Sequence, residues 1–322
     1  MSNPVFADRD SRGVYTWRGI EYPSVTRILG IIGSEDLRMY YARSVANECA
    51  GFIEKANAGI ITMGEAENEI LDKASRMTAP LRWRDHKGNI GSIAHHYLYR
   101  RALGDKIGYE QDWVMQTIET LGLEKRMDSG EDYGSTLAQS AMPYLKSAED
   151  FLNTYKPEFE MIGLEALVVN ETHGYAGRVD SIFTLQKRHW PHRLNWPWEG
   201  EQKTRQTGDF KTSSKIVKSH YYQGEAYRRA EFIGLLQDES EHIVELTDGV
   251  SIVHITPDTG PHVLPCIAKV DGDGVVDESV WELFVCLRFV FGIHESMPAP
   301  KRVKSAAAKM ARTPKGGKVC PF

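Results

Sequence analysis

The sequence contains no apolar run of the length that crosses a membrane. Its most apolar stretch, VWELFVCLRFVFGI, is shorter than the roughly 18–20 residues that a transmembrane helix needs, and it carries Glu282 and Arg288. This stretch is therefore predicted to be a buried helix. The N-terminal residues MSNPVFADRD also lack the basic-then-apolar layout of a secretory signal. The two absences together predict a cytoplasmic protein with no membrane partner.

Cysteine is scarce, and the four cysteines are scattered as Cys49, Cys266, Cys286 and Cys320. No two of them form a C-x-x-C pair, which argues against a structural zinc site and against a cysteine-bound cluster. Scattered cysteines in a protein of this size are most often reduced core residues. The sequence also lacks the G-x-x-x-x-G-K-[ST] and H-E-x-x-H motifs. Neither a P-loop nucleotide site nor a zincin-type site is therefore expected.

Acidic residues exceed basic ones overall, but not at the C-terminus. The net charge is −5, whereas the segment from Met297 onward holds seven Lys or Arg and no Asp or Glu. This tail therefore carries +7 and the rest of the chain −12. A local basic strip can attract a polyanion whatever the total charge. A disordered solubilising end is the equally consistent alternative.

The first half of the chain is predicted to be mainly helical. A short hairpin over residues 12–23 leads to Ser24, whose hydroxyl is suited to cap the start of a helix. Apolar residues then recur at helical spacing, and Gly104 is typical of a helix C-terminus. The predicted helices cover residues 36–58, 64–77, 91–104, 110–122 and 135–155.

After Tyr155 the β-branched and apolar content is typical of strands. A Trp-, Pro- and Arg-rich insertion over residues 188–206 interrupts them, and it has no regular pattern. Its aromatic and basic residues suit either base stacking or packing of a loop on the domain. The predicted strands cover residues 161–170, 175–185, 207–213 and 262–270 and a strand pair over 242–258, with helices over 220–236 and 279–295.

This order of elements predicts an α/β fold, in which helices flank a mixed β-sheet behind a helical N-terminal portion. No internal repeat and no linker interrupts the chain, so one domain is predicted over residues 1–296. Its helical part covers about 24–156 and its sheet core about 157–296. Residues 297–322 form the basic tail, which is predicted to be flexible.

Two acidic residues and a lysine in the strand region form a candidate metal site. On a strand, residues i and i+2 point to the same side, so Asp209 and Lys211 project together while Phe210 points into the core. If the strand of Asp180 lies beside theirs, two carboxylates and one ammonium converge. Two hard oxygen ligands suit Mg²⁺ or Mn²⁺, and a nearby Lys suits phosphodiester hydrolysis. A D-x-K motif alone is equally typical of a surface ion pair.

The ordered set of motifs resembles the PD-(D/E)XK nuclease superfamily, and within it the RecB-like exonucleases of recombination complexes, phages and CRISPR-associated proteins. The resemblance spans roughly residues 20–295 and is most specific from 174 to 227. The opening YPSVTRIL is similar to the N-termini of phage-encoded members. The matching motifs are G-x-x-x-H (Gly91, His95), G-x-x-D (Gly177, Asp180), D-x-K (Asp209, Lys211) and Q-x-x-x-Y (Gln223, Tyr227).

The resemblance implies a restriction-endonuclease-like sheet and a role for each matched residue. Asp180, Asp209 and Lys211 would be catalytic. The metal would be held by His95, Asp180, Asp209 and the backbone carbonyl of Phe210. Glu165 is a further candidate on the family pattern. Gln223 and Tyr227 would contact DNA or brace the catalytic strand, with ordinary helix packing as the alternative.

The implied activity is that of a Mg²⁺- or Mn²⁺-dependent DNA exonuclease acting in phage or cellular replication, recombination or repair. Some relatives bind an iron–sulfur cluster through four cysteines, but the cysteines here are too dispersed, so none is expected. Expected partners are DNA and a recombinase, a single-strand-binding protein or a helicase, in the cytoplasm of the cell or of a phage host. Two alternatives stay open: a structure-specific or restriction-type endonuclease, and a non-catalytic DNA-binding protein that retains the fold.

Overall fold

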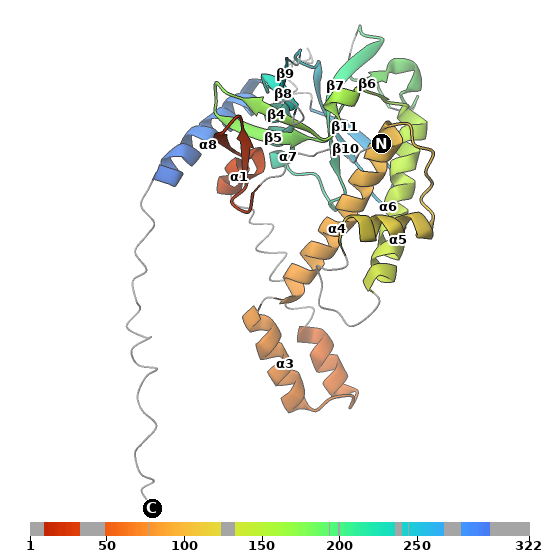
Figure 1. Ribbon diagram of the computed structural model, residues 1–322. Coiled ribbons are helices and arrows are strands. Elements are labelled where there is room, and N and C mark those ends of the chain that lie inside the picture. Colours follow the sequence, from red (N-terminus) through yellow and green to blue (C-terminus); the bar gives the residue numbers. More distant parts are fainter. Residues whose placement is uncertain are drawn as a thin grey trace, which may run out of the picture.

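The computed structural model describes most of the chain as helices packed around mixed β-sheets (Figure 1). This confirms the predicted α/β class with a helical N-terminal portion. Among the described residues, no helix has both the length and the apolar character needed to cross a membrane. The described residues are 10–32, 49–76, 78–123, 133–192, 194–198, 200–235, 240–243, 245–266 and 278–296.

The central sheet has five strands in the order β11-β10-β7-β6-β3. Strand β7 pairs in parallel with β10, and the other neighbours pair antiparallel. The parallel pair requires a crossover, and α7 (Lys218–Arg228) lies in the segment that makes it. The strand bounds are β3 Glu158–Phe159, β6 Ser181–Gln186, β7 Lys203–Lys211, β10 Gly249–His254 and β11 His262–Pro265.

A second, antiparallel sheet has the order β5-β4-β8-β9. The β1-β2 hairpin lies on one of its faces, where Trp17 packs against Phe232. The opposite face contacts α1, α7 and α8. The bounds are β1 Val14–Trp17, β2 Ile20–Pro23, β4 Ala166–Asn170, β5 Tyr175–Val179, β8 Phe232–Leu235 and β9 Ser240–Ile243.

Three helices, α4, α5 and α6, bury their apolar faces against one face of the central sheet and form the largest core. Helix α7 covers the other face, where a Cβ on Gly224 would lie only 2.3 Å from Val250. The helix bounds are α1 Val25–Leu29, α3 Met63–Arg76, α4 Thr78–Ala102, α5 Gln111–Thr120, α6 Tyr133–Tyr155 and α8 Glu278–Ser296, with short 3₁₀ turns at Gly30–Ile32, Met161–Gly163 and Lys187–His189.

Several predicted elements are confirmed. The 12–23 hairpin is present, and the Ser24 hydroxyl accepts a hydrogen bond from the Arg27 amide at the start of α1. Helices α3, α5, α6 and α8 lie within two residues of their predicted bounds. Of the predicted helix over 36–58, residues 49–57 are helical, and 33–48 lie outside the described residues. The predicted tail over 297–322 also lies outside them.

Other predicted elements were wrong in extent. Helix α4 begins at Thr78, well before Gly91, and the strand predicted over 161–170 begins only at Ala166 after a 3₁₀ turn. Helix α7 ends at Arg228, because the following residues pair as β8 between β4 and β9. A short apolar run such as FIGLL is compatible with the period of a helix or of a strand, so its pairing with other strands decides which one forms. The pair predicted over 242–258 is also wrong, since β9 pairs with β8 and β10 with β7.

The strand predicted over 175–185 is broken at Asp180 into β5 and β6. Strand β5 pairs with β4, whereas β6 pairs with β7 in the other sheet. The single residue between them lets the chain pass from one sheet to the other. Asp180 therefore lies where the two sheets meet.

The tryptophans of the 188–206 insertion pack on one another. Trp190, Trp196 and Trp198 make edge-to-face contacts with ring centroids 4.8–5.7 Å apart. Trp190 is buried in the main core beside Tyr155. This arrangement supports the packing alternative. The insertion is also more ordered than predicted, because β7 already begins at Lys203.

The cysteines only partly follow their prediction as buried residues. Cys266 is buried, Cys49 is half-buried and Cys286 is exposed, and all three are free thiols. Cys320 lies outside the described residues.

Candidate metal centre

Helix α4 positions His95 beside the C-terminal end of β7, the middle strand of the central sheet. Its apolar residues, Ile93, Ala94, Tyr97 and Leu98 among them, are buried in the main core. One turn before His95, a Cβ on Gly91 would lie 3.1 Å from the Thr212 hydroxyl. The glycine therefore allows α4 to approach the chain that follows β7, which explains the G-x-x-x-H motif in physical terms.

Backbone pairing brings Glu165 and Asp180 together. The Glu165 amide donates to the Asp180 carbonyl at 3.0 Å, one step beyond the Ala166–Val179 pair of β4 and β5. Glu165 has a φ of +49°, a left-handed conformation that costs a non-glycine residue roughly 1–2 kcal/mol. The surrounding pairing maintains this strain, and the Glu165 side chain lies beside Asp180.

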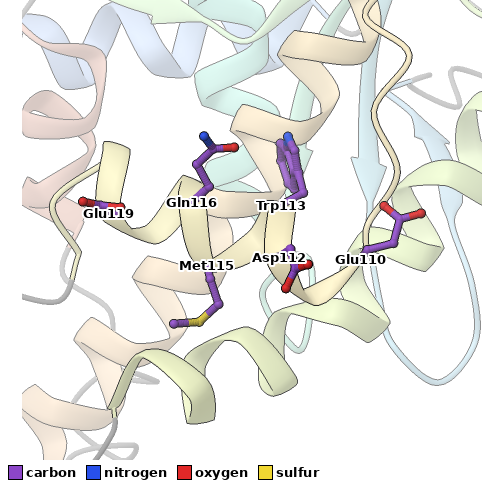
Figure 2. A pocket seen from close by; sticks show the side chains of 6 residues that line it. All are labelled: Glu110, Asp112, Trp113, Met115, Gln116 and Glu119. Atoms are coloured by element: carbon purple, nitrogen blue, oxygen red, sulfur yellow. The ribbon is translucent and has the colours of Figure 1, made fainter.

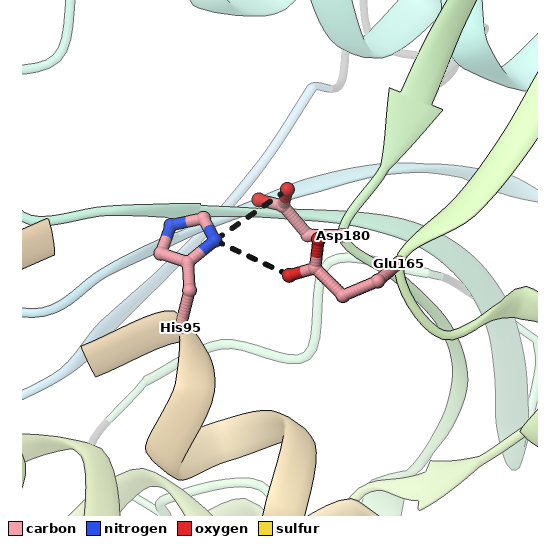
Figure 3. A group of neighbouring side chains, drawn as sticks. All are labelled: His95, Glu165 and Asp180. Carbon is pink, nitrogen blue, oxygen red and sulfur yellow. Dashed lines mark ion pairs between the residues drawn. The ribbon is translucent and has the colours of Figure 1, made fainter. Parts of the chain in front are cut away.

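The three side chains converge on one point (Figure 3). His95 Nδ1 lies 3.5 Å from Glu165 Oε1 and 3.6 Å from Asp180 Oδ1. One ligand atom from each residue lies within 4.8 Å of the other two. Two of these residues were predicted from the motifs, and the structure places Glu165 with them.

The other nitrogen of His95 faces β7. His95 Nε2 lies 3.0 Å from the Phe210 carbonyl oxygen. When Nε2 carries the proton and donates this bond, the lone pair of Nδ1 faces the two carboxylates. The Phe210 carbonyl, predicted as a metal ligand, here accepts a hydrogen bond from His95 and retains a second lone pair.

Asp209 and Lys211 form an ion pair beside this group. Lys211 Nζ lies 2.6 Å from Asp209 Oδ2 and 2.7 Å from Oδ1. As the period of a strand predicts, Phe210 between them points into the core and packs on Phe151. Asp180 Oδ2 accepts a hydrogen bond from the Phe210 amide at 2.7 Å. This bond links Asp180 to β7, the strand that carries Asp209 and Lys211. Among the described residues, Asp209 belongs to no group of three ligand atoms as close as His95, Glu165 and Asp180.

Burial and the neighbouring charges together shift the pKa values of the site. Burial raises the pKa of Asp180 and of Asp209, and Lys211 lowers both without reversing the direction. Burial on its own would lower the pKa of Lys211, but Asp209 and Asp180 raise it. Burial would also lower the pKa of His95, but Asp180 and Glu165 raise it to about 9. The carboxylates therefore favour the protonated, cationic forms of His95 and Lys211.

Gln223 and Tyr227 brace the site from α7. Gln223 Nε2 donates to Asp209 Oδ1 at 3.3 Å and to the Tyr227 hydroxyl at 3.0 Å. A Cβ on Gly177 would lie 2.3 Å from the Tyr227 ring, so the glycine of G-x-x-D makes room for the tyrosine of Q-x-x-x-Y. Of the predicted roles, bracing of the catalytic strand is the one that these contacts support.

The donor set fits a divalent ion. Ligands on one octahedral ion with bonds near 2.1–2.3 Å are separated by roughly 3 Å when adjacent and 4.2–4.6 Å when opposite. The distances between His95, Glu165 and Asp180 fall near this range. Burial raises the pKa of Asp180, and a divalent ion bound there would stabilise its ionised form.

Sequence reasoning missed Arg178, which stands within the G-x-x-D motif. Arg178 Nε lies 3.0 Å from Glu165 Oε2. No signal pointed to it, because only the pairing of β4 with β5 brings Arg178 beside Glu165.

The pocket in Figure 2 lies along α5, apart from the motif residues. Its lining is largely polar. One lining residue, Trp113, stacks on His96 with the two ring centroids 6.1 Å apart. His96 therefore faces Trp113 of α5. The lining residues are Glu110, Asp112, Trp113, Met115, Gln116 and Glu119.

A scan against protein-family models finds no match, and a search of curated proteins finds no significant similarity. The function is therefore argued from the geometry of the site.

His95→Gln is expected to weaken Mn²⁺ binding about 10–100-fold and Mg²⁺ binding less, because an imidazole ligand suits a transition ion better than Mg²⁺. Isothermal titration with each ion measures both affinities. His96→Gln is the matched control, since His96 lies on the same helix but faces Trp113. Equal Mn²⁺ affinities for the two variants would remove His95 from the ligand set.

Proposed function

We propose that this protein is a Mg²⁺- or Mn²⁺-dependent DNA nuclease of the PD-(D/E)XK type, and that it acts as an exonuclease. The observation that carries the proposal is the convergence of His95, Glu165 and Asp180 next to the ion pair of buried Asp209 and half-buried Lys211. A metal-ligand group adjoining a lysine is the equipment for metal-assisted phosphodiester hydrolysis.

In this proposal His95, Glu165 and Asp180 hold the ion, with Asp209 beside them. A bound ion would supply Lewis-acid polarisation of the phosphate and would lower the pKa of a water molecule. Asp209 orients the Lys211 ammonium, which its neighbours keep protonated. Lys211 therefore donates a hydrogen bond to the phosphate or the attacking water and offsets the negative charge that develops.

The proposed setting is phage or cellular DNA replication, recombination or repair in the cytoplasm. A recombinase, a single-strand-binding protein or a helicase is the proposed partner.

Two alternatives give different results in one experiment. A structure-specific or restriction-type endonuclease would use the same residues on internal sites. A non-catalytic DNA-binding protein would need neither the metal group nor Lys211, so the Asp209–Lys211 pair favours an enzyme.

The test incubates purified protein with end-labelled linear DNA and with circular DNA, in Mg²⁺, Mn²⁺ or EDTA. Linear DNA is expected to be degraded only with metal, and circles are expected to survive. Lys211→Ala should slow cleavage about 10²–10³-fold, the usual effect of removing one donor that stabilises transition-state charge. Lys203→Ala, an exposed lysine at the other end of β7, should match the wild type.

Cleavage of circles would favour the endonuclease. DNA binding without cleavage in any metal would leave the non-catalytic binder.

A further inference from the structure

Arg178 is the most exposed charged group around the candidate site. Its side chain is 41% exposed, compared with 9% for Glu165 and 18% for Lys211. Strand β5 carries Arg178 between Gly177, which leaves room for the Tyr227 ring, and Val179, and both of these residues are buried. A rigid strand therefore presents a guanidinium to solvent at the rim of the metal group.

Glu165 holds the guanidinium in place. Its Oε2 lies 3.0 Å from Arg178 Nε, while its Oε1 faces His95 at 3.5 Å. One carboxylate thus links the predicted metal ligand His95 to the exposed arginine. A guanidinium anchored in this way retains less rotamer freedom, which lowers the entropy loss on binding a ligand.

The charge of the site depends on Arg178. With His95 neutral, as a metal ligand must be, three carboxylates (Glu165, Asp180, Asp209) outnumber the two cations Lys211 and Arg178 by one. A divalent ion bound through a neutral His95 would bring the site to one positive charge. Without Arg178 the same loaded site would be neutral, and its field would attract a phosphodiester, which carries one negative charge, less strongly.

We propose that Arg178 binds a non-bridging oxygen of the DNA phosphate that enters this site. A guanidinium forms charge-assisted, bidentate hydrogen bonds with phosphate, which an ammonium cannot reproduce. The inference rests on the proposed function, since it takes DNA as the ligand, but it concerns binding and is testable without cleavage.

The first test measures how salt weakens binding of a labelled oligonucleotide in Ca²⁺, a hard ion that suits the same oxygen ligands, with the DNA checked for intactness. Arg178→Gln should weaken binding about 10-fold or more. It should also lower the slope of log affinity against log salt by about 0.7–0.9, the contribution of one phosphate contact. Arg18→Gln is the control, because Arg18 is 45% exposed and paired with Glu241.

The second test replaces single phosphates with neutral methylphosphonates, one position at a time. Wild-type protein should lose affinity at one position where Arg178→Gln does not, because both changes remove the same contact. Arg178→Lys keeps the positive charge but cannot make a bidentate hydrogen bond. Its loss of affinity at that position should lie between those of the wild type and Arg178→Gln. Melting curves of all variants verify that they are folded.

Equal losses at every position in wild type and Arg178→Gln, or an unchanged salt slope, would overturn the inference. A phosphate contact at Arg178 in a protein that never cleaves DNA would support the inference and sink the nuclease proposal. Metal-dependent cleavage that is unchanged in Arg178→Gln would support the nuclease proposal and contradict the role of Arg178.

Discussion

Asp180→Asn is expected to reduce metal-dependent DNA cleavage by at least about 10³-fold, the largest effect of any substitution considered. Asp180 contributes to both halves of the site, since Oδ1 faces His95 and Oδ2 accepts the Phe210 amide. An asparagine keeps the shape and one oxygen, so it can still accept that amide. It loses the negative charge that a divalent ion requires.

The measurements are initial cleavage rates with Mg²⁺ or Mn²⁺, and Mn²⁺ affinity by titration without DNA. Asp248→Asn is a matched control, because Asp248 Oδ2 also accepts an amide of β7, that of Arg205 at 2.6 Å, but far along the strand from Asp209. The control should retain metal affinity and rate. Near wild-type cleavage by Asp180→Asn would remove Asp180 from the site.

Gly177→Ala is expected to lower the free energy of unfolding by about 1–3 kcal/mol, the usual effect of overpacking. The new Cβ would lie 2.3 Å from the Tyr227 ring. That ring is buried, and its hydroxyl accepts a hydrogen bond from Gln223, so it has little freedom to move. A shift of the ring would also displace Gln223 from Asp209, so cleavage should fall together with stability.

Chemical denaturation of Gly177→Ala and of Gly64→Ala measures the difference. Gly64 lies in α3, and a Cβ there meets nothing within 4 Å, so this control should be neutral or slightly stabilising. A double-mutant cycle with Tyr227→Ala tests the cause, since Gly177→Ala should be almost harmless once the ring is absent. An equal loss in both backgrounds would show that the ring is not responsible.

Local patterns in the sequence were enough to predict the fold class and the shared face of Asp209 and Lys211, whereas His95 and Glu165 were candidates only through the family resemblance. The period of a strand correctly predicted that Phe210 points into the core while Asp209 and Lys211 share a face. Helical spacing predicted α3, α5, α6 and α8, and capping chemistry predicted Ser24. These features depend on neighbours within a few residues, which a single sequence contains.

Only the tertiary structure decided that His95, Glu165 and Asp180 form one group of candidate metal ligands. Glu165 and Arg178 are close because β4 pairs with β5, and Asp180 reaches β7 because the chain changes sheets at that residue. The local sequence pattern of a strand does not show which strand it pairs with. The 175–185 segment was therefore predicted as one strand, although its two halves pair in different sheets. The sequence by itself determined which residue types were available for metal chemistry. The pairing of β4 with β5 and of β6 with β7, together with the packing of α4 beside β7, decided which of these residues meet. These contacts join segments that lie far apart in the sequence.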